Sequence, residues 1–272
     1  MRPVSTLAGF AALSCLIAPV MQAQSDHSHH DMPDTRPWSQ ADAYWGSEAM
    51  AETQGKVLHH HGEMTFWSVS VDRAEIAFAD GEEVGVVDGD VWYGGDINKL
   101  WFKTEGEYEF DHGEFEELEV QALWSRAISP FFDLQAGVRY DFEPDGKAYG
   151  VIGLQGMTPY RFEVDTAAFL SEDGDVTASA EVEYELMLTN RLHLEPRFEI
   201  GLSAQDSSEL GVAGGFTDAA LGVRLGYDVV REFTPYVGVE WQGSLGETRS
   251  WVRAAGDDPD ATVFVLGFSA WH

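Results

Sequence analysis

Apolar and polar residues alternate along most of this chain, from about Phe66 to the end, and this pattern restricts the possible folds more than any other feature. The alternation is clearest in residues 132–142, 176–188, 192–202 and 219–229. A period of two places apolar side chains on one face of a β-strand and polar side chains on the other, whereas a helix requires a period of about 3.6. The sequence therefore predicts an all-β protein.

Two all-β architectures fit this pattern. One is a soluble antiparallel sandwich with its apolar faces turned into a core; the other is a transmembrane antiparallel β-barrel with those faces turned to lipid. The predicted strands have about ten residues or more, against roughly 5–6 in most soluble sheets. Aromatic residues gather near strand ends, at 140–142, 160–162 and Trp241, and tight turns such as 143–146 and 172–175 join successive strands. These features favour a transmembrane barrel that lies in the outer membrane and contacts its lipids.

The alternating segments number twelve, an even count of the kind that bacterial single-chain barrels have. They are 66–78, 85–93, 98–110, 114–127, 131–143, 147–156, 160–171, 175–188, 191–203, 217–229, 232–244 and 261–271. The pattern is weakest in 85–93, so a barrel of ten strands is the alternative. Residues 206–216 and 246–260 are predicted to be longer loops.

The first residues have the layout of a secretory signal peptide. A basic start at Arg2 precedes the apolar run Leu7–Val20, and small residues lead to a cleavage site after Ala23. The alternative of a membrane anchor needs about 20 apolar residues, and polar residues end this run too early. Removal of 1–23 would also remove Cys15, the single cysteine of the chain, and leave no thiolate ligand for a metal.

The chain is strongly acidic, with 16 Lys and Arg against 47 Asp and Glu and a formal net charge of −31. The predicted signal peptide contains one charged residue, Arg2, so its loss would leave 15 basic against 47 acidic residues, or −32. Such a charge disfavours nucleic acid and anionic lipid headgroups as partners. Cations are the natural counterpart of this surface.

Residues 24–63, between the signal peptide and the barrel at 64–272, are polar and have no sustained period of two or of about 3.6. We expect a largely disordered periplasmic arm with one short helical turn near 41–51. Histidines and methionines in and just after this arm form two clusters: His27, His29, His30 and Met32, then His59, His60, His61 and Met64. Imidazole suits Cu(II) and thioether sulfur suits Cu(I), so the clusters could hold either copper ion. The residues alone leave open the alternative that they are hydrophilic side chains without a ligand role.

Four separated motifs in the predicted barrel resemble those of the copper resistance protein B family of outer-membrane proteins. They are Val91–Trp101 (VWYGGDINKLW), Gly137–Asp141 (GVRYD), Leu188–Leu192 (LTNRL) and Arg231–Val239 (REFTPYVGV). The resemblance runs in order from about Met64 to the end. It implies a barrel that takes part in copper tolerance, a His/Met arm that binds copper ions, and a periplasmic multicopper oxidase as a partner. This arm is short for the family, which favours transient capture of copper over strong storage.

Two neighbouring predicted strands carry rows of charged residues on one face. They are Glu181, Glu183 and Glu185 on one strand, and His193, Glu195, Arg197 and Glu199 on the next. These rows must face the lumen, because an Arg or Lys at the lipid midplane costs about 2–4 kcal/mol. The rows could form an acidic path for a cation or simply fill a small barrel with paired Arg and Glu, and the second interpretation is favoured.

The sequence thus predicts a copper-binding outer-membrane protein that sequesters copper in the periplasm or assists its export. Two alternatives are an outer-membrane hydrolase with its site at the barrel rim, and a passive or structural barrel. The chain has neither a Gly-x-Ser-x-Gly nor a His-Glu-x-x-His motif, and no serine is suitably spaced from His112 or His193, so we expect no enzyme activity.

Overall fold

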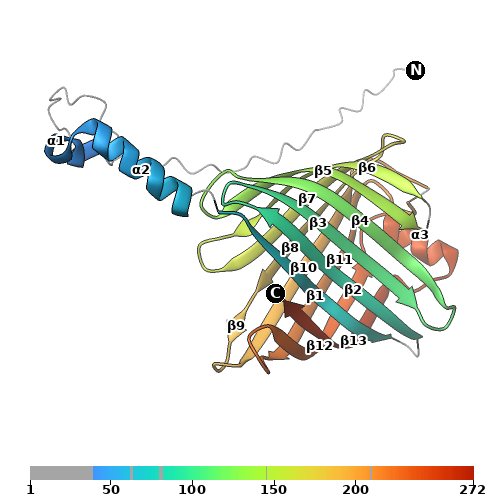
Figure 1. The fold of residues 1–272 in the computed structure, drawn as a ribbon. Helices are drawn as coiled ribbons and strands as arrows, with labels where there is room; N and C mark the ends of the chain where they lie inside the picture. The colour runs from blue at the N-terminus through green and yellow to red at the C-terminus, as the bar shows by residue number, and fades with distance from the viewer. Residues whose placement is uncertain (1–38, 62–63, 80–81, 145, 209) are drawn as a thin grey trace, which may run out of the picture. The chain divides into compact units, whose positions relative to one another are not determined.

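A computed structural model describes residues 39–61, 64–79, 82–144, 146–208 and 210–272 of the chain (Figure 1). The chain divides into two units at residues 58 and 59, and each unit is described by itself. The predicted signal peptide and the first His/Met cluster lie outside the described residues.

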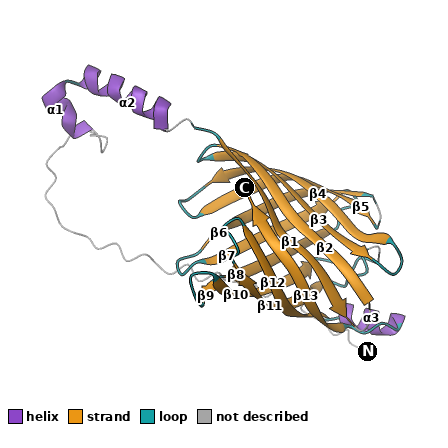
Figure 2. Cartoon of the chain, turned by 60° about the horizontal axis from the view of Figure 1, so that its bottom comes forward, coloured by secondary structure: helices purple, strands orange, loops and turns teal. Residues whose placement is uncertain are grey.

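The second unit is a closed barrel in which every pair of neighbouring strands is antiparallel (Figures 1 and 2). Its strands are β1 (Phe66–Ala79), β2 (Glu82–Gly94), β3 (Asn98–Glu109), β4 (Glu114–Ala127), β5 (Phe132–Glu143), β6 (Lys147–Met157), β7 (Phe162–Ser171), β8 (Val176–Tyr184), β9 (Leu186–Met187), β10 (Leu192–Ser203), β11 (Gly215–Tyr227), β12 (Phe233–Ser244) and β13 (Asp260–Trp271). The barrel closes where β13 pairs with β1, in a register that includes Phe78 opposite Phe264.

The segments β8 and β9 are two parts of one strand. Glu183 of β8 lies opposite Arg197 of β10, and Met187 of β9 lies opposite His193 in the same register, so the strand is interrupted at Glu185 without a shift. The barrel therefore has twelve strands, as the sequence predicts. The weakest predicted segment, 85–93, is a full strand in the structure, and the ten-stranded alternative is wrong.

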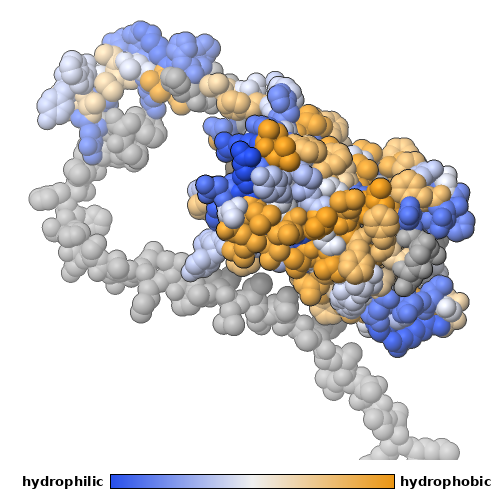
Figure 3. Space-filling view, turned by 90° about the horizontal axis from the view of Figure 1, so that it is seen from below, coloured by the Kyte–Doolittle hydropathy of each residue, from blue (hydrophilic) through white to orange (hydrophobic). Residues whose placement is uncertain are grey.

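The barrel wall explains the period of two. Along β11 nearly every second side chain is buried towards the lumen while its neighbours are exposed on the outside. The exposed positions are occupied by large apolar residues, such as Val138 at 61% exposure and Phe264 at 64%. Figure 3 shows these residues as a broad apolar area on the barrel wall with hydrophilic residues at its two ends. Such an area needs lipid as its solvent, and the protein is an outer-membrane barrel.

The two ends of the barrel differ in the length of their connections. At one end, where β1 begins and β13 finishes, strands are joined by the short connections 95–97, 128–131, 158–161, 188–191 and 228–232. We call this the short-turn end; in outer-membrane barrels the short turns face the periplasm. The opposite end carries the two long connections, 204–214 and 245–259, beside four connections of two to four residues.

One of those longer connections contains α3 (Thr248–Ala255), which the sequence analysis treats only as part of a loop. Arg249 of α3 donates to Asp260 at the start of β13, with an Nη1–Oδ1 distance of 2.7 Å. The Thr248 hydroxyl accepts a hydrogen bond from the backbone N–H of Ala213, 2.9 Å away. The helix is therefore tied to both long connections at the end opposite the C-terminus of β13 (Figure 2).

Before the barrel, the structure has a 3₁₀ turn, η1 (Ser39–Ala41), and the helices α1 (Asp42–Trp45) and α2 (Ser47–His61). The expected helical turn near 41–51 is thus present, but α2 continues well beyond it. Helix-forming residues occupy most of α2, and Lys56 pairs with Glu52 one turn earlier at 2.7 Å. Because nearly all of its side chains are exposed, α2 lacks the apolar stripe by which a helix is recognised in a sequence. No helix in the described ranges is long and apolar enough to cross a membrane.

Candidate metal-handling site

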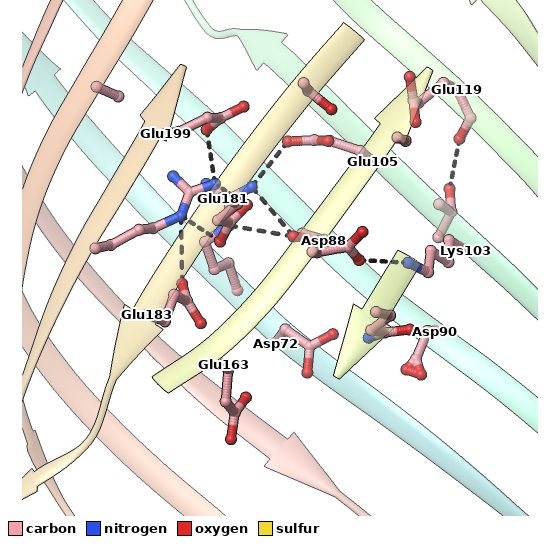
Figure 4. A pocket seen from close by; sticks show the side chains of 18 of the residues that line it. Asp72, Asp88, Asp90, Lys103, Glu105, Glu119, Glu163, Glu181, Glu183 and Glu199 are labelled. Carbon is pink, nitrogen blue, oxygen red and sulfur yellow. Dashed lines mark hydrogen bonds and ion pairs between the residues drawn. The ribbon is translucent and has the colours of Figure 1, made fainter. Parts of the chain in front are cut away.

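The barrel encloses a cavity of about 1150 Å³ that is lined by sixteen acidic and five basic side chains. Figure 4 shows carboxylates from several strands pointing into this space. The predicted charged rows of β8 and β10 face the lumen, as Glu181, Glu183, Glu195 and Glu199 line the cavity. Glu185 and His193 do not line it: Glu185 falls at the break between β8 and β9, and His193 lies near the start of β10 at the short-turn end.

The centre of the lumen is held by Arg197 of β10, which is only 5% exposed. Its Nε lies 2.7 Å from Glu181 Oε1 and its Nη2 lies 2.8 Å from Glu199 Oε2. Glu183 Oε1 is 3.3 Å from the same Nε, so three carboxylates converge on one guanidinium (Figure 4). The strand register produces this cluster, because Arg197 is paired with Glu183 and Glu199 with Glu181 across β8 and β10.

A second buried group joins β11 to its neighbour β12 and to β1, which is not its neighbour. Arg224 of β11 lies 2.9 Å from Glu75 Oε1 on β1 and 3.1 Å from Glu240 Oε2 on β12. The hydroxyl of Tyr236 donates to Glu75 Oε2 at 3.0 Å, and Glu75, Glu240 and Arg224 are all almost fully buried. Charge-assisted bonds of this kind are short and strong, and here they compensate charges that water does not reach.

Two further arginines are paired in the same way. Arg73 contacts Asp88 at 3.1 Å and Glu105 at 2.8 Å, and Arg139 contacts Glu119 at 2.5 Å and, with its Nε, Asp141 at 2.6 Å. The favoured interpretation of the rows as paired filling therefore describes each lumenal arginine. It does not account for the whole lining, since carboxylates outnumber the basic groups.

At the short-turn end, His193 of β10 has a different environment. It is 8% exposed, and its Nδ1 has no hydrogen-bond partner. Asp228 Oδ1 lies 3.6 Å from this nitrogen, beyond hydrogen-bonding distance.

Of the predicted copper ligands, the structure describes the second cluster only. His59 and His60 are exposed in the last turn of α2, with ring centroids 5.4 Å apart, and His61 ends the helix. Met64 follows just before β1 with its side chain 49% exposed. Within the described part of the chain, no three or more His, Cys, Asp or Glu residues are grouped so as to hold a metal ion. The structure thus leaves the metal-site prediction untested.

Residues 65–272 match the family model described as copper resistance protein B precursor (CopB). The chain belongs to the copper resistance protein B family. It is 40% identical to copper resistance protein B of Escherichia coli over 181 residues, which cover 66% of this chain and 60% of that protein. The corresponding homolog of Pseudomonas syringae pv. tomato is 37% identical over 66% of this chain and 61% of its own length. The matches thus span about three fifths of each relative.

Two porins are among the solved structures that are similar to this chain. The NanC porin superposes with a TM-score of 0.51 at 10% identity, over 74% of this chain and 98% of that one. The KdgM porin gives a TM-score of 0.48 at 12% identity, over 75% and 98%. At such identities the likeness concerns the fold alone.

Proposed function

We propose that this family member is a copper-binding protein that sequesters copper at the periplasmic face of the outer membrane or assists its export. The observation that carries the proposal is family membership over residues 65–272, in a chain whose histidines gather directly before the barrel. The role is one of binding and transport and involves no enzyme activity.

The arm supplies ligands for both copper oxidation states. His59 and His60 are exposed, and the exposed thioether of Met64 follows within a few residues. Since β1 starts at Phe66 at the short-turn end, these ligands are tethered to the periplasmic side of the barrel. A mixture of imidazole and thioether groups can accept Cu(II) and Cu(I), as the residues His27, His29, His30 and Met32 of the first cluster also can.

The acidic lumen supports a role in which the barrel does more than anchor the arm. Its carboxylates outnumber its basic groups, which favours cations over anions inside the barrel. A copper ion released from the arm would enter a region of favourable potential. A periplasmic multicopper oxidase is the partner that we propose for delivery of the ion, because the barrel begins at the short-turn end, which faces the periplasm in outer-membrane barrels.

Deletion of residues 24–63 tests the proposal. Cells that produce the deleted protein should lose copper tolerance, while the barrel still inserts and its migration on a gel still changes on heating. A matched control is the exposed Lys56→Gln and Glu52→Gln pair, which removes charges of the arm but no copper ligand. Unchanged copper tolerance after the deletion would refute the proposed role and favour a passive barrel.

A further inference from the structure

The unpartnered nitrogen of His193 is, with Trp101 Nε1, one of two buried side-chain atoms without a hydrogen-bond partner in the described part of the barrel. A buried polar atom without a partner costs free energy, so such atoms in native proteins usually have a function or a missing ligand. His193 Nδ1 is such an atom, at the short-turn end and two residues before Glu195, which lines the cavity. The nearest acidic oxygen, Asp228 Oδ1 at 3.6 Å, is too distant to satisfy it.

The surroundings hold this imidazole and the carboxylate in place. His193 is paired with Gly226 of β11, and a Cβ at that glycine would lie 2.3 Å from His193 Nε2. The imidazole ring of His193 therefore occupies space that is free only because residue 226 is a glycine. Its Nε2 packs against Gly226, and its Nδ1 faces Asp228. The Thr234 hydroxyl donates to Asp228 Oδ1 at 2.8 Å and orients the carboxylate, as the hydrogen-bond partners of metal ligands do.

The strand register adds a sulfur ligand. Met187 of β9 lies directly opposite His193 of β10, and directly opposed residues of an antiparallel pair point to the same face of the sheet. That face is the lumenal one, since Glu195 and Arg197 follow on it at alternate positions and line the cavity. Met187 is 41% exposed, so its thioether is accessible to an ion.

The distance between His193 and Asp228 fits a shared metal ion better than a hydrogen bond. First-row transition metals hold nitrogen and oxygen ligands at about 2.0–2.2 Å, and two such bonds at about 120° separate the ligand atoms by about 3.5 Å. The observed separation is 3.6 Å. Imidazole and thioether together prefer Cu(I), and the carboxylate is available as a third ligand.

We infer that His193, Met187 and Asp228 form a copper(I) site inside the short-turn end of the barrel. The ligand set comes from the barrel alone, whereas the choice of copper rests on the proposed function. The site would lie at the end of the barrel where β1 begins, on the short-turn side of the acidic cavity. It would receive an ion from the arm and present it to the lumen.

The test uses the full chain in detergent and Cu(I) as the probe, under anaerobic conditions, in competition with a chromophoric Cu(I) chelator. An arm-silent variant carries Ala at all six arm histidines and Leu at both cluster methionines: His27, His29, His30, His59, His60, His61, Met32 and Met64. We expect this variant to keep one Cu(I) ion. Adding Met187→Leu or His193→Gln should weaken that binding at least 10-fold, and Met187→Leu should remove the copper–sulfur signal from the X-ray absorption spectrum.

Two substitutions serve as matched controls. Met157→Leu removes another lumenal thioether at the same end, and His112→Gln removes an imidazole from a turn at the opposite end. Both should leave Cu(I) binding unchanged. The folded state of each variant is checked by its heat-dependent gel migration, and Met187→Leu keeps the test valid if His193→Gln fails to fold.

The outcomes separate the two proposals. No Cu(I) on the arm-silent variant, or binding that survives both Met187→Leu and His193→Gln, would overturn the barrel site and leave the arm function standing. Equal copper stoichiometry for the native and arm-silent proteins would instead refute the role of the arm.

Discussion

Buried polar groups are paired at the centre of the lumen, but one of them has no hydrogen bond at the short-turn end. At the centre, Arg197 and Arg224 are each surrounded by carboxylates at 2.7–3.3 Å from their closest nitrogens. At the short-turn end, the His193 Nδ1 is buried and has no hydrogen bond, and the Met187 thioether is exposed. Saturated pairing ties strands together, whereas an imidazole nitrogen and a thioether sulfur with free lone pairs leave room for a metal ion. The comparison thus assigns stability to the centre and binding to the end.

The largest expected effect is a loss of stability on removal of Arg224 from the central ion pairs. Arg224→Met would leave Glu75 buried without its cation and Glu240 with only Arg197, 3.7 Å away, and removal of one partner of a buried pair typically costs about 3–5 kcal/mol. Urea unfolding of the refolded barrel should show the loss. Arg191→Met, in an exposed turn, is the control and should have little effect. Equal unfolding midpoints for the two variants would show that the central network contributes no stability.

The next largest effect is expected at the short-turn end, where Gly226 makes room for the His193 ring. Gly226→Ala would push a methyl group into the His193 ring, and forcing extra volume into a packed site typically costs about 1–3 kcal/mol. We expect lower stability in urea and weaker Cu(I) binding in the arm-silent background. Gly150→Ala is the matched control, because its Cβ would meet no atom within 4 Å. If both glycine variants bind Cu(I) alike, the position of the imidazole does not matter.

A smaller effect concerns the end opposite to the short turns. Arg249→Ala removes the contact with Asp260 that ties α3 to β13, so amide hydrogen exchange in 248–255 should become faster while the barrel strands remain protected. Arg253→Ala, on the exposed side of the same helix, should leave exchange unchanged. Slow exchange in both variants would mean that other contacts hold α3.

The smallest effect is a titration outside the membrane-spanning strands. Glu109 accepts a hydrogen bond from His112 Nδ1 at 2.7 Å, which raises the pKa of this imidazole above its usual value of about 6.5. A raised folded-state pKa means that the contact stabilises the fold fully below the unfolded pKa and less as the pH rises through the folded one. Glu109→Gln should return the His112 pKa towards its usual value in an NMR titration. An unchanged pKa would show that the contact is absent in solution.

The barrel could be predicted from the sequence because a strand has a simple period that the membrane enforces on its outer face. Even the weak segment 85–93 is a strand in the structure, as β2 pairs with β1 and β3 along nearly its whole length. The sequence predicts only a short helical turn where α2 runs to His61, because the exposed side chains of α2 leave no apolar stripe. The charged rows could be assigned to the lumen because lipid excludes them.

The inner site of the barrel could not be predicted in the same way. His193 is visible in the sequence as one member of a charged row, but its isolation from hydrogen-bond donors and acceptors depends on the rotamers of its neighbours. Its relation to Met187 depends on a register that continues through the break at Glu185. Asp228 belongs to another strand connection, and only the folded barrel brings it to 3.6 Å.

Calorimetric titration of the mature protein with copper, beside a variant with all six arm histidines changed to Ala, tests the central claim most directly. The account predicts tight binding by the native protein and loss of most of that binding in the variant, with at most one Cu(I) ion retained under reducing conditions. Absence of tight binding by the native protein would contradict the account.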